Sequence, residues 1–180
     1  MKKNLFLHAL TAFACMMAAI LLCAAQTSFL PHYVNDAYIV PDLLLCMTLA
    51  LGILIKKPYG ATYSSLFGIF AGILADCTGG FGISLLPLFY MLCGYGAFVC
   101  ADILHEILPK KRLPIYFVIG LLAAFLRTVV AVIYVFLYSG SVPIPEIIRY
   151  VCIPLFLGTS LALLPTYFVS LLLTLPLKKV

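Results

Sequence analysis

Residues Gly68–Gly82 read Gly-Ile-Phe-Ala-Gly-Ile-Leu-Ala-Asp-Cys-Thr-Gly-Gly-Phe-Gly, and this is the most specific stretch of the sequence. It joins an apolar segment carrying Gly68 and Gly72 to one acid, Asp76, and to a turn containing Gly80 and Gly82. Glycines four residues apart share a helix face and let two membrane helices approach closely. Glycines after the helix allow the backbone to reverse sharply. We therefore predict a tightly packed helix that ends in a turn.

Composition decides how this segment is interpreted. Of the 180 residues, 65% are hydrophobic and 9% are charged, which is far from the balance of a soluble domain. A helix needs about 20 residues to cross the roughly 30 Å hydrocarbon layer, so the chain has room for about six crossings and little else. We predict an all-α polytopic membrane protein, with residues 1–180 forming one compact bundle. The predicted spans are Leu5–Ala25, Ile39–Ile55, Tyr59–Ala75, Leu85–Leu108, Leu113–Tyr138 and Ile147–Leu175.

Basic residues fall at alternate ends of these spans. Nine of the eleven lysines and arginines lie on one predicted side of the membrane, namely Lys2, Lys3, Lys56, Lys57, Lys110, Lys111, Arg112, Lys178 and Lys179. The opposite connections carry Asp36, Asp76 and Glu146 and contain no Lys or Arg. Because positive charge marks the cytoplasmic side, both termini are predicted to lie inside the cell.

Two features of the charged segments allow other interpretations. The net charge of +5 does not indicate nucleic-acid binding, because the basic residues sit in twos and threes at helix ends, where they meet lipid headgroups. The N-terminal segment resembles a secretory signal, with Lys2 and Lys3, an apolar run and small residues around Cys23. Its length favours a retained helix over a cleaved signal.

Arg127 and Asp42 are ionisable residues inside predicted spans, where a charge costs about 2.5–3.5 kcal/mol even on a lenient scale. Arg127 lies 15 residues after Arg112, and Asp42 lies 14 residues before Lys56. At about 1.5 Å per residue both reach roughly the same depth, some 21–22 Å from the cytoplasmic end. We predict an Asp42–Arg127 ion pair. The alternative is that Asp42 caps the helix that follows Pro41 while Arg127 faces a watery groove or a lipid-thinned region.

Other polar residues give weaker indications. Asp76, at the outward end of its span, either accepts backbone N–H groups or is a solvated loop acid. Asp102, His105 and Glu106 share a helix face, which we interpret as partners of the basic cluster Lys110–Arg112 rather than as a metal site. No catalytic triad, phosphate-binding loop or haem-ligand pattern occurs in the sequence. The sequence therefore predicts no enzyme activity, no cofactor and no bound metal.

The sequence resembles the MreD family of bacterial rod-shape-determining membrane proteins. Three features carry the resemblance: Pro41-Asp42 opening a leucine-rich span, the series Gly68, Gly72, Asp76, Gly80 and Gly82, and an aromatic fourth span that ends in a basic cluster. The specific part runs from Pro41 to roughly Gly96.

The resemblance implies a non-enzymatic scaffold in the bacterial inner membrane. Its partners would be MreC and, through MreC, the cytoskeletal protein MreB and the RodA–transpeptidase pair that builds side-wall peptidoglycan. Helix faces in the bilayer would bind the transmembrane segment of MreC, while the inner basic loops around Lys56, Lys57 and Lys110–Arg112 would face the cytoskeleton.

An alternative interpretation is the substrate-binding S component of an energy-coupling-factor vitamin transporter, which is also a compact six-helix protein. Ala14 and Ala18 satisfy the weak Ala-x-x-x-Ala pattern of its first helix. Such a protein needs convergent polar side chains in an outward pocket, and this sequence offers few of them.

Overall fold

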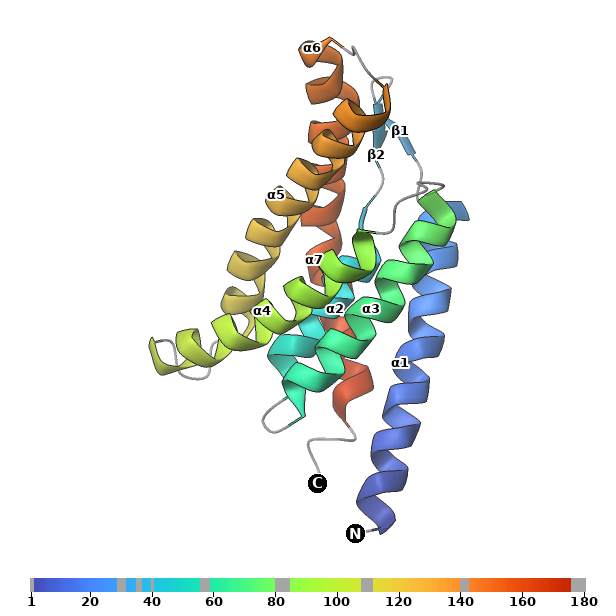
Figure 1. Ribbon diagram of the computed structural model, residues 1–180. Coiled ribbons are helices and arrows are strands. Elements are labelled where there is room, and N and C mark those ends of the chain that lie inside the picture. Colours follow the sequence, from blue (N-terminus) through green and yellow to red (C-terminus); the bar gives the residue numbers. More distant parts are fainter. Residues whose placement is uncertain are drawn as a thin grey trace.

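The computed structural model describes residues 2–28, 32–34, 37–39, 41–55, 59–79, 85–107, 112–139 and 143–175. These residues form a helical bundle with one short hairpin of two strands (Figure 1). The elements in chain order are α1 (Lys2–Ser28), β1 (His32–Val34), β2 (Ala37–Ile39), α2 (Leu43–Leu54), α3 (Gly60–Gly79), α4 (Leu86–Ile107), α5 (Arg112–Ser139), α6 (Ile144–Ile147), the π-helix η1 (Ile148–Cys152) and α7 (Ile153–Thr174). The prediction of an all-α fold is confirmed.

Among the described residues, five helical stretches have the length and the apolar composition of membrane spans. These stretches are Leu7–Thr27, Gly60–Cys77, Leu86–Glu106, Arg112–Leu137 and the continuous rod Ile144–Thr174. Each corresponds to a span predicted from the sequence, although α3 continues to Gly79 and the last rod starts at Ile144. Whether α1 is retained or cleaved as a signal stays a prediction.

The second predicted span, Ile39–Ile55, differs most from the structure. Ile39 belongs to β2, which pairs antiparallel with β1, and the helix begins only at Leu43. Pro41 explains the late start, because proline has no N–H to donate and disfavours a helical conformation in the residue before it. The 12 residues of α2 measure about 18 Å, well short of the roughly 30 Å hydrocarbon layer.

Helix α2 lies inside the bundle rather than in its wall. All 12 of its residues are buried, and it packs against α1, α3, α4, α5 and α7. In lipid, a backbone that is not part of a complete spanning helix is tolerated where protein covers it. The second segment is therefore a short central helix preceded by the hairpin, whose strand β2 packs against α7 and η1.

The last rod combines α6, η1 and α7 and lies beside α5 (Figure 1). Its π-helical turn ends at Cys152, two residues before Pro154. Because Pro154 cannot donate to the carbonyl four residues earlier, a local change to wider turns relieves the clash of its ring with that carbonyl. The start of α1 and the end of α7 lie toward the same end of the molecule, and α6 lies at the other (Figure 1).

Candidate functional site

The most polar part of the bundle interior lies at the start of α2, where Asp42 is 1% exposed. Oδ1 of Asp42 accepts the backbone N–H of Leu45 at 3.0 Å, so the carboxylate caps the helix. A negative charge at this position is favourable because the N-terminus of a helix carries partial positive charge. The capping role considered from the sequence is therefore present.

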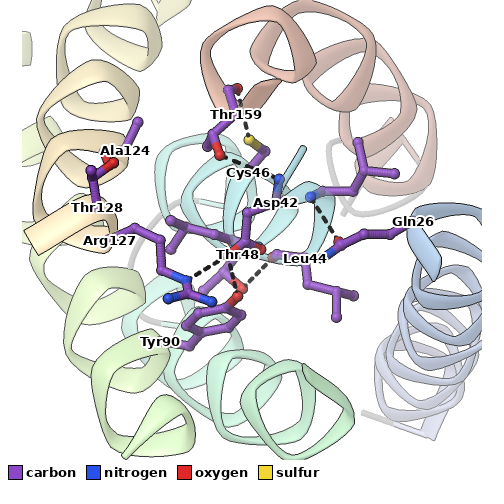
Figure 2. A network of polar contacts seen from close by, with 12 residues as sticks. Gln26, Asp42, Leu44, Cys46, Thr48, Tyr90, Ala124, Arg127, Thr128 and Thr159 are labelled. Atoms are coloured by element: carbon purple, nitrogen blue, oxygen red, sulfur yellow. Dashed lines mark hydrogen bonds and ion pairs between the residues drawn. The ribbon is translucent and has the colours of Figure 1, made fainter. Parts of the chain in front are cut away.

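The same carboxylate binds Arg127. Nε of Arg127, on α5, donates to Oδ2 of Asp42 at 2.9 Å, and the two side chains are 16% and 2% exposed. Tyr90, on α4, donates its hydroxyl to the same oxygen. Figure 2 shows Arg127 and Tyr90 reaching Asp42 from neighbouring helices. The predicted Asp42–Arg127 pair is confirmed, and it exists together with the helix cap rather than in place of it.

Two further helices bind the backbone at the start of α2. The N–H of Asp42 donates to Oγ1 of Thr159, on α7, at 3.3 Å. The N–H of Leu43 donates to Oε1 of Gln26, on α1, at 3.0 Å. The first N–H groups of a helix have no partner within the helix, and an unsatisfied one is costly where water is excluded. Thr159 and Gln26 therefore provide the hydrogen-bond acceptors that water provides at an exposed helix end.

The opposite end of α2 is also held by side chains. Nη1 of Arg112, on α5, donates to the carbonyl of Leu54 at 3.3 Å, which supports the last turn. At Cys46, the fourth residue of α2, the backbone carbonyl accepts the hydroxyl of Tyr116 at 3.1 Å, and this hydroxyl lies 3.0 Å from Oγ1 of Thr166, on α7. Arg112 was assigned from the sequence to a basic inner surface. Its partner in the structure is α2.

We call the group Gln26, Asp42, Tyr90, Arg127 and Thr159 the polar node. Asp42 caps α2, and the other members lie on α1, α4, α5 and α7, so five helices meet at the start of α2. Both carboxylate oxygens of Asp42 accept hydrogen bonds from the protein itself. Such a carboxylate is suited to fixing helices in place, because its hydrogen-bonding capacity is used inside the node.

Glycines make the closest helix contacts around the node. A Cβ on Gly68 of α3 would lie 2.5 Å from the carbonyl oxygen of Tyr90, and one on Gly94 of α4 would lie 2.6 Å from that of Ser64. Gly72 lies equally close to the backbone of Pro87. The predicted packing face of Gly68 and Gly72 is therefore confirmed, and its partner is α4.

Gly96 does not pack internally as Gly94 does. Within the part of the chain that is described, a Cβ on Gly96 would meet no atom within 4 Å. The physical reason is the helical period: Gly94 faces α2 and α3, whereas Gly96, two residues later, is turned by about 200°. Gly96 lies on the outer face of α4.

The remaining predicted residues have mixed outcomes. Asp76 is half-buried in the last turn of α3, which continues past it to Gly79. Gly80, Gly82, Lys56, Lys57, Lys110 and Lys111 lie outside the described residues. The part of the chain that is described holds no group of three metal-ligating side chains, and Asp102 and Glu106 are exposed.

Sequence reasoning did not identify Gln26, Tyr90 or Thr159 as members of the polar node. A glutamine near a span end and a threonine or tyrosine within a span are common in membrane helices, and their spacing from Asp42 in the sequence carries no period. The sequence does indicate that Asp42 needs partners, because the start of a buried helix needs hydrogen-bond donors and acceptors from other segments. The sequence does not indicate which helices supply them.

The fold and the node define a multi-pass membrane protein whose interior contains a charged pair fixed by hydrogen bonds. Comparisons of the chain with models of protein families, with curated proteins and with solved structures give no match. The class of the protein therefore rests on its helices and their composition, and its function is a proposal.

Proposed function

We propose that this chain is a non-enzymatic membrane scaffold of the bacterial elongation machinery. In this role it binds the transmembrane helix of MreC and, through MreC, helps to couple MreB filaments to the RodA–transpeptidase pair. The proposal combines the resemblance of Pro41-Asp42 and Gly68–Gly82 to the MreD family with one observation on α4.

That observation is the open face around Gly96. A neighbouring helix packs directly against Gly68, Gly72 and Gly94. In contrast, no described atom fills the space beside Gly96. Leu92 and Ile103, both 56% exposed, and exposed Cys100 lie on the same side of α4. Close approach of helices in lipid depends on small residues. Gly96 and Cys100, four residues apart, give a second helix a place to pack closely.

The polar node also favours a scaffold over a vitamin-binding S component. A binding pocket needs polar groups that converge on a ligand. Here the carboxylate of Asp42, the guanidinium of Arg127 and the hydroxyl of Tyr90 bind one another. Their bonds join α2 to α4 and α5, and Gln26 and Thr159 add α1 and α7, so the node supports the rigid platform that docking of a partner requires.

The proposed location is the bacterial cytoplasmic membrane, with both termini in the cytoplasm. The distribution of basic residues supports this orientation, as does the position of the start of α1 and the end of α7 toward one end of the bundle. The basic inner loops would then face MreB. Fusions of a cytoplasmic fluorescent reporter to either terminus are expected to fluoresce, and a periplasmic phosphatase fused there is expected to be inactive.

Co-purification with MreC from mild detergent tests the proposal. We expect the wild-type chain to retain MreC and Gly96→Leu to retain at least about tenfold less, which corresponds to a loss of roughly 1.4 kcal/mol of packing. Ala24→Leu is the matched control, because it enlarges an exposed small residue on α1 instead. Gel filtration of each variant checks that the bundle is intact.

Two results would count against different parts of the proposal. If the wild-type chain retains no MreC although both proteins elute as folded species, the scaffold role is wrong. If MreC is retained equally by wild type and Gly96→Leu, MreC binds at a face other than the outer side of α4.

A further inference from the structure

The guanidinium of Arg127 uses only part of its hydrogen-bonding capacity. Its Nε donates to Oδ2 of Asp42 at 2.9 Å, while Nη1 and Nη2 carry four further N–H groups. Among the described residues, neither of these two nitrogens has a hydrogen bond of normal geometry, although the hydroxyl of Tyr90 lies beside the guanidinium. The side chain is 16% exposed, and the buried polar atoms without a partner do not include Nη1 and Nη2. These nitrogens therefore reach the surface of the bundle.

This part of the surface lies deep in the apolar stretch of α5. Arg127 is 15 residues after Arg112 and 10 residues before Leu137, the two ends of that stretch, which places it about 22 Å and 15 Å from them. Both distances exceed the length of an arginine side chain, so the guanidinium does not reach lipid phosphates by snorkelling. N–H groups that face hydrocarbon without an acceptor are costly. An acceptor from another molecule would remove this cost.

The charges already present at the site favour a neutral acceptor. Arg127 and Asp42 form a pair without net charge, and Tyr90 adds none while it donates its hydroxyl. A second carboxylate or a phosphate would leave the site with a negative charge inside the membrane, where a charge is costly. A helix that crosses the hydrocarbon layer uses its backbone carbonyls within itself. The acceptor on such a helix is therefore a side-chain oxygen of Ser, Thr, Asn or Gln.

The terminal nitrogens of Arg127 lie beside the outer face of α4. Cys93, half-buried on α4, interacts electrostatically with Arg127. Seven residues separate Cys93 from Cys100, so their side chains point only about 20° apart, and Gly96 lies about 60° from Cys93 around the helix. Gly96 and Cys100 form the face to which we assign the MreC helix. A helix packed on that face lies next to Arg127.

We infer that the transmembrane helix packed along Gly96 and Cys100 presents one neutral side-chain oxygen to Nη1 or Nη2 of Arg127. The inference rests on the proposed scaffold function and adds a polar contact to the packing of small residues. The polar node then has two roles. It holds the central helix in place, and it selects a partner whose acceptor lies at the matching depth, because a wholly apolar helix would cover these N–H groups without bonding them.

Arg127→Lys tests the contact while it keeps a positive charge beside Asp42. Lysine has a single nitrogen, which cannot bind Asp42 and also occupy the positions of Nη1 and Nη2. The purified full chain is titrated with full-length MreC in mild detergent, and the dissociation constant is measured. We expect Arg127→Lys to raise this constant at least about fivefold. Arg149→Lys makes the same exchange at the exposed arginine of η1 and is expected to change it less than about twofold.

Substitutions in MreC give a second, independent measurement. Each Ser, Thr, Asn and Gln of its transmembrane helix is replaced singly by Ala, and any Asp or Glu there is replaced in the same way. We expect one neutral residue to be required, its loss raising the dissociation constant of the wild-type chain at least about fivefold. The same replacement should have little further effect on Arg127→Lys, because both changes remove one contact. If Arg127→Lys does not fold, the series with the wild-type chain decides the question.

Equal affinity of wild type and folded Arg127→Lys for MreC would overturn the inference, and so would losses that add in the double variant. A series in which no neutral residue matters, or in which only an Asp or Glu matters, would overturn it equally. These outcomes would leave the scaffold function intact. If MreC does not bind the wild-type chain although both proteins are folded, the scaffold function and this inference fail together.

Discussion

Arg127 and Asp42 are 85 positions apart in the chain, yet Nε of Arg127 lies 2.9 Å from Oδ2 of Asp42. The bond joins the middle of α5 to the first residue before α2. It places two opposite charges in the interior of a bundle that has the composition of a membrane protein, where each alone would be costly. The pair, with Tyr90, connects the central helix to two of the helices around it.

Breaking the pair should destabilise the fold strongly. Asp42→Asn and Arg127→Gln are each expected to lower the free energy of unfolding by about 3–5 kcal/mol, because each leaves its former partner buried without compensation. The double variant is expected to lose less than the sum of the two, because it leaves neither charge alone. Titration with a denaturing detergent in mixed micelles measures all three.

Additive losses in that double-mutant cycle would show that the two charges do not stabilise each other. Unchanged folding yields for both single variants would dismiss the structural role of the pair altogether. Replacing the exposed Arg149, on η1, by Gln serves as the control, and its effect is expected to stay within about 0.5 kcal/mol.

Removing one oxygen atom should weaken the polar node without opening a large cavity. Tyr90→Phe keeps the aromatic ring, which is fully buried, and deletes the hydroxyl that donates to Asp42. Hydrogen bonds to charged groups contribute about 1.5–3 kcal/mol, so a loss of that size is expected in the same titration. A loss below about 0.5 kcal/mol would mean that the hydroxyl contributes little beside Arg127.

The start of α2 gives a third prediction. Thr159→Val removes the acceptor of the Asp42 N–H and should cost about 1–3 kcal/mol, because a buried donor is left unsatisfied. Thr128→Val is the matched control, since the hydroxyl of Thr128 donates to Ala124 within its own helix at 2.9 Å. Its loss is expected to be the smaller one. Equal losses for the two variants would mean that the cost comes from removing any buried threonine hydroxyl and is not specific to the N–H of Asp42.

Two glycines of α4 should respond differently to the same substitution. Gly94→Ala places a methyl group 2.6 Å from the carbonyl oxygen of Ser64, which forces α3 and α4 apart and should cost about 1–3 kcal/mol. Gly96→Ala meets open space and should be neutral or stabilising, because alanine favours a helix over glycine. A large loss at Gly96 in the isolated chain would contradict the outward position described for it.

Several features of the fold were predictable because they follow from the number of residues that separate two positions in a helix. The depth of Asp42 and Arg127 follows from their distances to the basic ends of their spans, and equal depth is necessary for a pair. The packing role of Gly68 and Gly72 follows from their spacing of four residues. Both inferences need the helix geometry and the approximate span ends, which an apolar sequence with sparse charges supplies.

The short central helix was not predictable in the same way. The apolar run from Leu43 to Ile55 has no polar face, so its sequence does not distinguish a helix surrounded by protein from one that crosses the bilayer. The hairpin that precedes it depends on long-range packing of β2 against α7 and η1. Tyr90 and Thr159 became members of the node only through the arrangement of whole helices, which no local spacing encodes.

The complete burial of α2 has a consequence for how its sequence can vary. Helices in the wall of the bundle have a lipid-facing side, so tolerated substitutions there should recur every three or four residues. Along α2 no side faces lipid, and such a repeat should be absent. Exchanges along Leu43–Leu54 should therefore be accepted mainly when a neighbouring helix changes with them. Although its apolar sequence has no distinctive feature, α2 would then be the part of this chain whose sequence changes most slowly in evolution.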